Sequence, residues 1–346
     1  MHPEAHRYQP SDQMHFYAPL QPATPSRLGD LSLRSHEVAL ELVGSTIDHH
    51  AQAALAHEKA TGSLPFSAQE CITRLQNGID AFKSHVSNPD NYLPGARENI
   101  TARYRHADTK SLGKTIEERV AARLGAFERR GFAIDVDGTL TTDPAGYLET
   151  VLPGSQTAER LLKQLGREEF VKVFSLTWSS ILKETPDLFT NGARQTDVVI
   201  RDGVEDFFTH VHEEKSEVQI VSANHWPFVS GVLGKIQTLK DARVWAVDHD
   251  SAVSTEKSYV VDHIAKTDTQ TALIYIGDGH SDLSVVNAGP FQTSDVIACY
   301  FALEGGTFAR ELKTKKLPFF TYKSFYDISE KLAEIDALAN SETIAA

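Results

Sequence analysis

Cysteine is scarce in this sequence, and long runs of apolar residues are missing. The 346 residues contain two cysteines, Cys71 and Cys299, which lie far apart and form no CxxC motif. We therefore expect no disulfide framework, and a reducing cytosol is the simplest compartment. No stretch approaches the roughly 18 apolar residues of a membrane helix, and MHPEAHRYQP lacks the charged-then-apolar pattern of a signal peptide. These absences predict a soluble, cytoplasmic protein with no membrane partner.

A surplus of basic residues is also missing. Lysine and arginine total 34 against 47 aspartates and glutamates, for a formal net charge of −13. A nucleic-acid backbone is therefore not expected as a partner, because no cationic excess exists to displace its counterions. A phosphorylated small molecule remains compatible with this charge, since a site around a bound divalent cation is locally positive. The length suggests about two domains.

The first third of the chain reads as a tail followed by helices. Residues 1–29 are rich in Pro, Gln and His and predict a flexible tail. Residues 30–128 show apolar positions at three- and four-residue spacing, which predicts a helical N-terminal extension. Two helices have capping-box starts, in which an N-cap is followed three residues later by glutamate: Ser67 with Glu70, and Thr115 with Glu118. Three roles fit this extension: enlarging a cap, forming a homodimer contact, or packing behind a sheet.

The hydrophobic period changes from helical to strand-like at Phe132. Five short apolar strands follow at wide intervals: FAIDV, VQIVSA, ARVWAVDH, TALIYIGD and VIACYFAL. Enough chain for a helix separates each strand from the next, so we predict an α/β fold with a parallel sheet covered on both faces. Ligands of such sheets bind beyond the carboxyl ends of the strands.

One long segment interrupts this alternation. Residues 144–204 read as helices and follow directly after the first acidic strand end, so an insertion there would lie over the mouth of the site. We therefore predict a catalytic core of residues 129–143 and 205–335, a helical cap of residues 144–204, and a C-terminal tail of residues 336–346.

The first strand ends in the acidic motif Asp135-Val136-Asp137-Gly138-Thr139. Alternation along the strand places Asp135 and Asp137 on the same side, and Gly138 permits a tight departure of the backbone. Two such carboxylates suit attack on phosphorus and proton transfer. A calcium-binding EF-hand loop needs glycine at its sixth position and glutamate at its twelfth, a pattern that this motif lacks. By itself the motif would equally fit an acidic turn without function.

A second acidic motif, GDGHSD, follows a later apolar strand. Its Asp278 and Asp282 are four residues apart at an expected helix start and offer oxygen ligands to a hard cation. Ser222, at the tip of VQIVSA, is suited to donate a hydrogen bond to a phosphoryl oxygen. Lys257 opens the amphipathic stretch KSYVVDHIAK and would offset the charge of the carboxylates. Lys266 is the alternative candidate for the lysine that offsets this charge.

Together these residues resemble the four motifs of the haloacid dehalogenase superfamily of aspartate-nucleophile phosphatases. The motifs are DVDGT, Ser222 on its strand, Lys257 and GDGHSD, and the resemblance spans about residues 131 to 325. The segments VVIRDGVEDFF and SANHW are similar to the phosphoserine-phosphatase-like branch. The resemblance implies a three-layer, Rossmann-like parallel sheet with a small helical cap inserted after the first motif.

The resemblance also implies a magnesium-dependent phosphomonoester hydrolase acting on a small phosphorylated metabolite. Asp135 would be the nucleophile and Asp137 the general acid and base. The remaining expected roles fall into three groups: further catalytic residues Ser222 and Lys257; substrate-binding residues Gly138, Thr139, Ala223 and Asn224; and Mg²⁺ ligands Asp135, Asp137, Asp278 and Asp282, with Asp282 further from the ion.

Phosphoserine itself is not the predicted substrate. Phosphoserine phosphatases carry a glutamate soon after the first motif, whereas this sequence has Pro144 and Ala145 there, and Glu149 lies further on. Two other functions stay open. A phosphotransferase or mutase would pass the phosphoryl group from Asp135 to a second substrate, and a non-catalytic scaffold would use the fold alone.

Overall fold

The computed structural model describes residues 92–142, 198–239, 242–247, 257–279, 281–286 and 295–345. In this part of the chain, no helix is both long enough and apolar enough to cross a membrane. The predicted tail, the helix expected at Ser67 and the body of the predicted cap lie outside the described residues.

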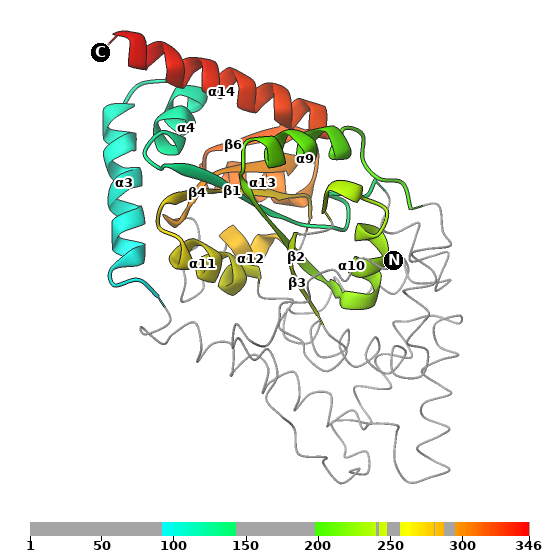
Figure 1. The fold of residues 1–346 in the computed structure, drawn as a ribbon. Coiled ribbons are helices and arrows are strands. Elements are labelled where there is room, and N and C mark those ends of the chain that lie inside the picture. The colour runs from blue at the N-terminus through cyan, green and yellow to red at the C-terminus, as the bar shows by residue number, and fades with distance from the viewer. Residues whose placement is uncertain are drawn as a thin grey trace, which may run out of the picture.

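The described residues contain a six-stranded sheet (Figure 1). Its strands are β1 (Arg129–Ile134), β2 (Glu217–His225), β3 (Arg243–Val247), β4 (Thr271–Gly277), β5 (Ile297–Leu303) and β6 (Phe319–Tyr322). They lie in the order β3-β2-β1-β4-β5-β6, and every neighbouring pair is parallel. The predicted α/β class and parallel sheet are confirmed, and the strand order reverses beside β1, where such sheets bind their ligands.

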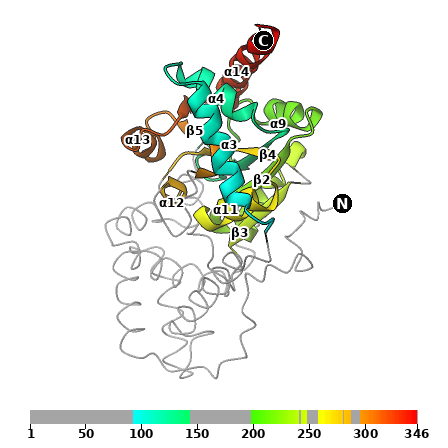
Figure 2. The same cartoon turned by 90° about the vertical axis from the view of Figure 1, so that its left-hand side faces the viewer.

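Helices cover both faces of the sheet, as the alternation of the sequence predicted. On one face lie α9 (Val204–Glu213) and α14 (Phe325–Ala345), which contact each other. On the other face lie α11 (Lys257–Thr267), α12 (Leu283–Val286) and α13 (Thr307–Thr314). The chain between β2 and β3 forms α10 (Trp226–Leu233) and the 3-10 turn η3 (Gln237–Leu239). Figures 1 and 2 show the sheet between the two helical layers.

Two N-terminal helices, α3 (Ala96–Lys110) and α4 (Ile116–Leu124), pack against the amino ends of the strands (Figure 2). Arg103 donates a hydrogen bond to the carbonyl oxygen of Thr269, just before β4, at 3.2 Å. Arg123 donates to the carbonyl of Ala298, at 3.3 Å, where the register between β4 and β5 shifts. Of the three roles considered for the extension, its described part packs behind the sheet.

The start of α4 confirms the second predicted capping box. The backbone N–H of Thr115 donates to the Glu118 carboxylate at 2.7 Å, and the Glu118 N–H donates to the Thr115 hydroxyl at 3.3 Å. The helix ends at Leu124, earlier than predicted, because Gly125 forms its C-cap and the chain then turns into β1.

Two described features cross the predicted boundaries. Ile200, within the predicted cap, forms an antiparallel bridge with Thr141 of the predicted core, and α9 begins at Val204, the last residue of the predicted cap. The predicted tail at 336–346 is helical through Ala345, since α14 continues past the boundary. Beyond the boundary the half-buried Leu338 and Ala339 still pack against the core. The buried residues of α14 follow helical spacing: Phe325, Ile328, Leu332 and Ile335.

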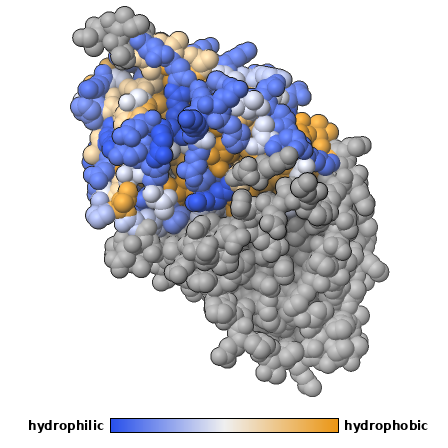
Figure 3. Space-filling model, viewed as in Figure 1, coloured by the Kyte–Doolittle hydropathy of each residue, from blue (hydrophilic) through white to orange (hydrophobic). Residues whose placement is uncertain are grey.

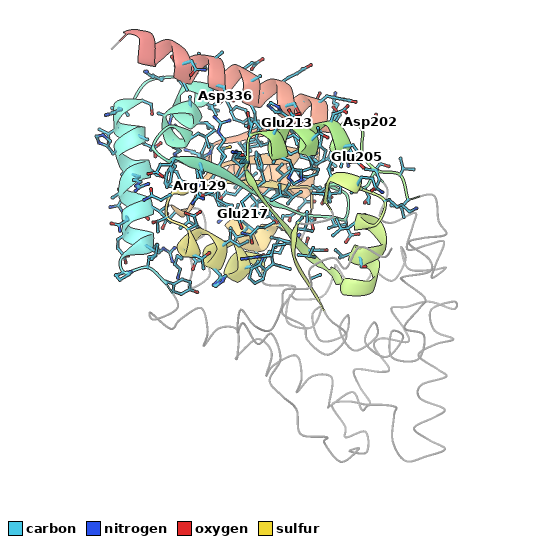
Figure 4. The ribbon with its side chains drawn as sticks, viewed as in Figure 1. Arg129, Asp202, Glu205, Glu213, Glu217 and Asp336 are labelled. Atoms are coloured by element: carbon cyan, nitrogen blue, oxygen red, sulfur yellow. The ribbon has the colours of Figure 1, made fainter. Side chains whose placement is uncertain are left out.

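Aromatic side chains join β1 to the helical layer of α9 and α14. The ring centroids of Phe132 and Phe207 lie 5.4 Å apart, and those of Phe207 and Phe325 lie 5.2 Å apart. Edge-on contacts of this kind add to the apolar burial that holds the layers together. Hydrophilic residues cover most of the described surface in Figure 3. In Figure 4, Arg129 and Glu217 mark the amino ends of β1 and β2, and the acidic motifs lie at the opposite ends.

Candidate active site

The carboxyl ends of three neighbouring strands carry the predicted residues. Asp135 directly follows β1, Ser222 lies within β2, and Asp278 directly follows β4. β1 pairs with β2 on one side and with β4 on the other, so these ends are adjacent in space. The Asp135 N–H also donates to the carbonyl of Ile276 at 3.0 Å, which extends the pairing to the site. The topology therefore brings the separate motifs together.

Lys257, the first residue of α11, joins the two acidic motifs. Its ammonium lies 2.6 Å from Asp135 Oδ1 and 2.7 Å from Asp282 Oδ1, and all three residues are buried. Lys266 lies more than two turns further along α11 and pairs instead with Asp262, at 2.9 Å. Lys257 is therefore the lysine of the acidic cluster.

Asp282 uses both of its carboxylate oxygens within the protein. Its Oδ1 accepts hydrogen bonds from the Lys257 ammonium at 2.7 Å and from the Tyr275 hydroxyl at 2.6 Å. Its Oδ2 accepts from the backbone N–H groups of Asp278 and Gly279, each at 2.9 Å. With four donors already bound, Asp282 is suited to hold Lys257 and the Asp278 loop in place. The sequence analysis named Asp282 as an Mg²⁺ ligand further from the ion than the others, and that ligand role stays a prediction.

The cluster carries more negative than positive charge. Asp135, Asp278 and Asp282 offer carboxylate oxygens that lie within 4.8 Å of one another, and the ammonium of Lys257 contacts two of them. Ionised, three carboxylates and one ammonium leave two negative charges in a buried space. That balance fits a divalent cation, and buried carboxylate oxygens are the ligands that Mg²⁺ prefers.

The pKa shifts follow the same imbalance. Burial raises the pKa of Asp135 well above its usual value, and the nearby Lys257 only partly offsets this. Burial, together with Asp282, raises the pKa of Asp278 to about 7. Burial lowers the pKa of Lys257, but the contacts with Asp135 and Asp282 outweigh it, so the net shift is upward and the ammonium stays charged. Without further positive charge, the two carboxyls resist ionisation.

A compact turn follows Asp135. The carbonyl oxygen of Val136 accepts hydrogen bonds from three successive backbone N–H groups, those of Thr139 at 3.3 Å, Leu140 at 2.9 Å and Thr141 at 3.2 Å. The turn needs a left-handed residue at Gly138, whose φ is +76°. A Cβ there would also collide with the carboxylate of Asp278. Gly138 therefore lets the two acidic strand ends approach each other.

Three of the other predicted site residues have described side chains: Asp137, Thr139 and Ser222. Asp137 is partly exposed and lies between Asp135 and the turn, as expected. The Thr139 side chain is fully buried and its hydroxyl donates to Asp278 Oδ1 at 3.4 Å, whereas its substrate-binding role stays a prediction. Ser222 is buried near the carboxyl end of β2, where the pairing with β3 becomes irregular. The side chains of Ala223 and Asn224 lie outside the described residues.

We expect Gly138→Ala to impair both catalysis and Mg²⁺ binding. An alanine at positive φ costs about 1–2 kcal/mol of stability, and displacing Asp278 by about 1 Å would lower kcat by roughly 100-fold. Gly113→Ala is the matched control, because Gly113 has φ +82° but no atom within 4 Å of an added Cβ. Steady-state kinetics and thermal melting should show similar destabilisation of both variants but lost turnover only for Gly138→Ala. Equal turnover of the two variants would show that the site does not depend on the close approach of Gly138 to Asp278.

Two residues of the site were missed by the sequence analysis. Tyr275 lies in the buried strand β4 and donates to Asp282. A tyrosine within an apolar run is a signal of a buried hydrogen-bond partner, so this residue was open to prediction. Arg201 donates to three carbonyls of the turn after Asp137. Its sequence context, VVIRDG, does not distinguish a buried arginine from an exposed one.

The similarity of this chain to known proteins is limited to solved structures. No protein-family model matches the sequence, and no curated protein matches it. Among solved structures, phosphoserine phosphatase in its apo form is 13% identical and covers 59% of this chain and 98% of its own, with a TM-score of 0.40. A predicted phosphatase from Clostridium acetobutylicum is 14% identical and covers 60% and 100%, with a TM-score of 0.42.

Cytosolic 5'-nucleotidase IIIB bound to cytidine is 14% identical and covers 68% of this chain and 94% of its own, with a TM-score of 0.41.

Proposed function

We propose that this protein is a Mg²⁺-dependent phosphomonoester hydrolase that forms an aspartyl-phosphate on Asp135. The observation that carries the proposal is the grouping of Asp135, Lys257 and Asp278 at adjacent strand ends. A buried carboxylate held by a lysine, beside a second carboxylate suited to a cation, is the equipment for attack on a phosphoryl group.

Two residues divide the chemical steps. An oxygen of Asp135 forms a bond to phosphorus as the bond from phosphorus to the ester oxygen breaks, and Asp137 gives its proton to the departing alcohol. In the second step, Asp137 removes a proton from water as the water oxygen attacks phosphorus. The bond between phosphorus and Asp135 then breaks, which releases phosphate and restores both carboxyl groups.

The remaining residues hold the phosphoryl group and its charge. Lys257 lies against the nucleophile and would neutralise part of the charge on the transferring group, and Ser222 would donate a hydrogen bond to that group. Asp135, Asp278 and the backbone carbonyl of Asp137 would hold Mg²⁺, which when bound supplies electrostatic stabilisation of the phosphoryl oxygens. Asp282 keeps Lys257 and the Asp278 loop in position.

The proposed substrate is a small phosphorylated metabolite. The negative net charge argues against nucleic acid, and the predicted cap is the segment that would select the substrate. We also propose that the protein acts in the cytoplasm and that the part of its helical N-terminal extension before residue 92 forms a homodimer contact. Sedimentation of the full chain and of a chain beginning at residue 92 would test this contact. Only the full chain should sediment as a dimer.

Phosphate release from phosphate esters tests the function directly. With Mg²⁺, the purified protein should release inorganic phosphate from p-nitrophenyl phosphate and from members of a phosphorylated-metabolite panel. A chelator should stop the reaction, and added Mg²⁺ should restore it. Transfer of the phosphoryl group to an added alcohol without phosphate release would instead indicate a phosphotransferase. If the protein with Mg²⁺ bound releases phosphate from none of the esters, the result would favour the alternative of a non-catalytic scaffold.

A further inference from the structure

A buried arginine lies beneath the turn that follows the nucleophile. Arg201 is 9% exposed, and its guanidinium donates four hydrogen bonds, all to backbone carbonyl oxygens. The acceptors are Gly138 at 2.5 Å, Thr139 at 2.9 Å, Thr141 at 3.2 Å and Lys323 at 2.9 Å. A planar guanidinium has five N–H groups in a fixed fork, and nearly all of that capacity is used here.

Three of those acceptors belong to the turn that carries Asp137 and Gly138. The N–H groups of this turn are directed to the Val136 carbonyl and to the Thr141 hydroxyl, whereas Arg201 binds carbonyls on its other side. Without the guanidinium, these buried carbonyls would lose their donor, which typically costs about 1–3 kcal/mol for each group. The turn could recover that cost only by moving toward water.

The fourth acceptor connects the turn to the end of β6, the edge strand that β5 separates from β4. Arg201 donates to the carbonyl of Lys323, directly after β6, and its guanidinium stacks over the ring of Tyr322 at 5.8 Å. The Tyr322 hydroxyl in turn donates to the carbonyl of Gly277 at 3.3 Å. Arg201 and Tyr322 therefore connect the loop after Asp135 to the residue that precedes Asp278.

Arg201 also lies where the chain returns to the core from the predicted cap. The N–H of Thr142 donates to the carbonyl of Val199 at 3.0 Å, and the N–H of Arg201 donates to the carbonyl of Leu140 at 2.8 Å. The next residue, Asp202, accepts a hydrogen bond from the N–H of Phe325 at 2.8 Å, and Figure 4 places it near the start of α14. The segment that leads into the predicted cap, residues 140–142, and the segment that leads out of it, residues 199–201, are thus joined by hydrogen bonds at Arg201.

From these contacts we infer that Arg201 is a positioning residue for the proposed phosphatase site. It fixes the turn after Asp135 against the chain that follows β6, so that Asp137 and the nucleophile keep their separation. The inference rests on the proposed function for its catalytic consequence. Its structural consequence, protection of the turn, can be measured without any activity.

The test compares Arg201→Ala with Arg123→Ala. Arg123 is also a mostly buried arginine that binds a backbone carbonyl, but it lies at the amino ends of the strands. We expect Arg201→Ala to lower kcat about 100-fold with little change in KM, because small misplacements of catalytic groups carry losses of this size. Added guanidinium, below denaturing concentrations, should restore part of kcat. Arg123→Ala should keep its kcat and show no rescue.

A second variant and a second measurement cover the case in which Arg201→Ala does not fold. Arg201→Lys keeps the charge but lacks the fork, so its kcat should fall by roughly 10-fold. Backbone amide exchange of residues 138–142 should become at least about 10-fold faster in the Arg201 variants and stay unchanged in Arg123→Ala.

Unchanged exchange, or kcat values equal to that of Arg123→Ala, would overturn the positioning role. If the wild-type protein hydrolyses no phosphate ester, the proposed function fails, and the exchange rates alone decide whether Arg201 holds the turn.

Discussion

Asp135→Asn should abolish phosphate release while leaving the fold intact. The amide cannot form an acyl-phosphate, so we expect turnover to fall on the order of 10⁴-fold or more. Burial raises the pKa of the Asp135 carboxyl in the folded protein. A folded-state pKa above the unfolded value means that ionising this group at neutral pH costs stability. The neutral asparagine removes that cost, and Asp282 still pairs with Lys257.

Two measurements on this variant separate lost chemistry from lost structure. The melting temperature without Mg²⁺ should equal or exceed that of the wild type, and the increase on adding Mg²⁺ should be smaller, because one ligand is gone. Asp268→Asn is the matched control, since Asp268 is a carboxylate at the amino end of the sheet, 2.8 Å from Arg129. It should keep full turnover. Wild-type phosphate release by Asp135→Asn would show that the nucleophile is misassigned.

The grouping of the acidic motifs was predictable from the sequence because topology enforces it. A parallel sheet places all of its carboxyl ends at one edge, so apolar strands that end in Asp135 and Asp278 had to converge once the sheet was inferred. Lys257 was predictable for a related reason. It opens a helix that follows a strand, and such helices begin at the same edge of the sheet.

The roles within the cluster were not predictable in the same way. Spacing alone does not separate Asp278 from Asp282, and the sequence analysis assigned both to the metal, with Asp282 further from the ion. The structure separates them because Asp282 turns both oxygens toward protein donors, among them Tyr275 and Lys257. Arg201 could not be predicted because its hydrogen-bond partners are backbone carbonyls, which are present at every residue and leave no signal in the sequence.

The missed secondary structure has equally specific causes. β6 spans four residues, too few for an alternating pattern to appear, and it lies at the edge of the sheet. α3 falls within the extension predicted to be helical, but its own bounds were not predicted. Its buried residues have helical spacing, and two of the four are alanines: Ala96, Ile100, Tyr104 and Ala107. Alanine contributes little to an apolar pattern, so helical periodicity was weak there.

Lys257→Ala should lower both stability and turnover. Removing one partner of a buried ion pair leaves uncompensated charge, which typically costs about 3–5 kcal/mol, and here Asp135 and Asp282 would both lose their ammonium. Loss of a fixed positive donor at the phosphoryl group should lower kcat by roughly 100- to 1000-fold and weaken phosphate binding. Mg²⁺ should raise the melting temperature of this variant more than that of the wild type, because the ion replaces missing positive charge.

Lys266→Ala is the control that separates the catalytic effect of removing Lys257 from its effect on stability. Lys266 lies on the same helix and also pairs with a buried carboxylate, that of Asp262, but outside the acidic cluster. Chemical denaturation should show that both variants are destabilised, whereas only Lys257→Ala should lose phosphate binding and turnover. If Lys266→Ala were the catalytically damaged variant, the contact between Lys257 and Asp135 would be a structural ion pair, and the charge that stabilises the transferring group would have to come from elsewhere.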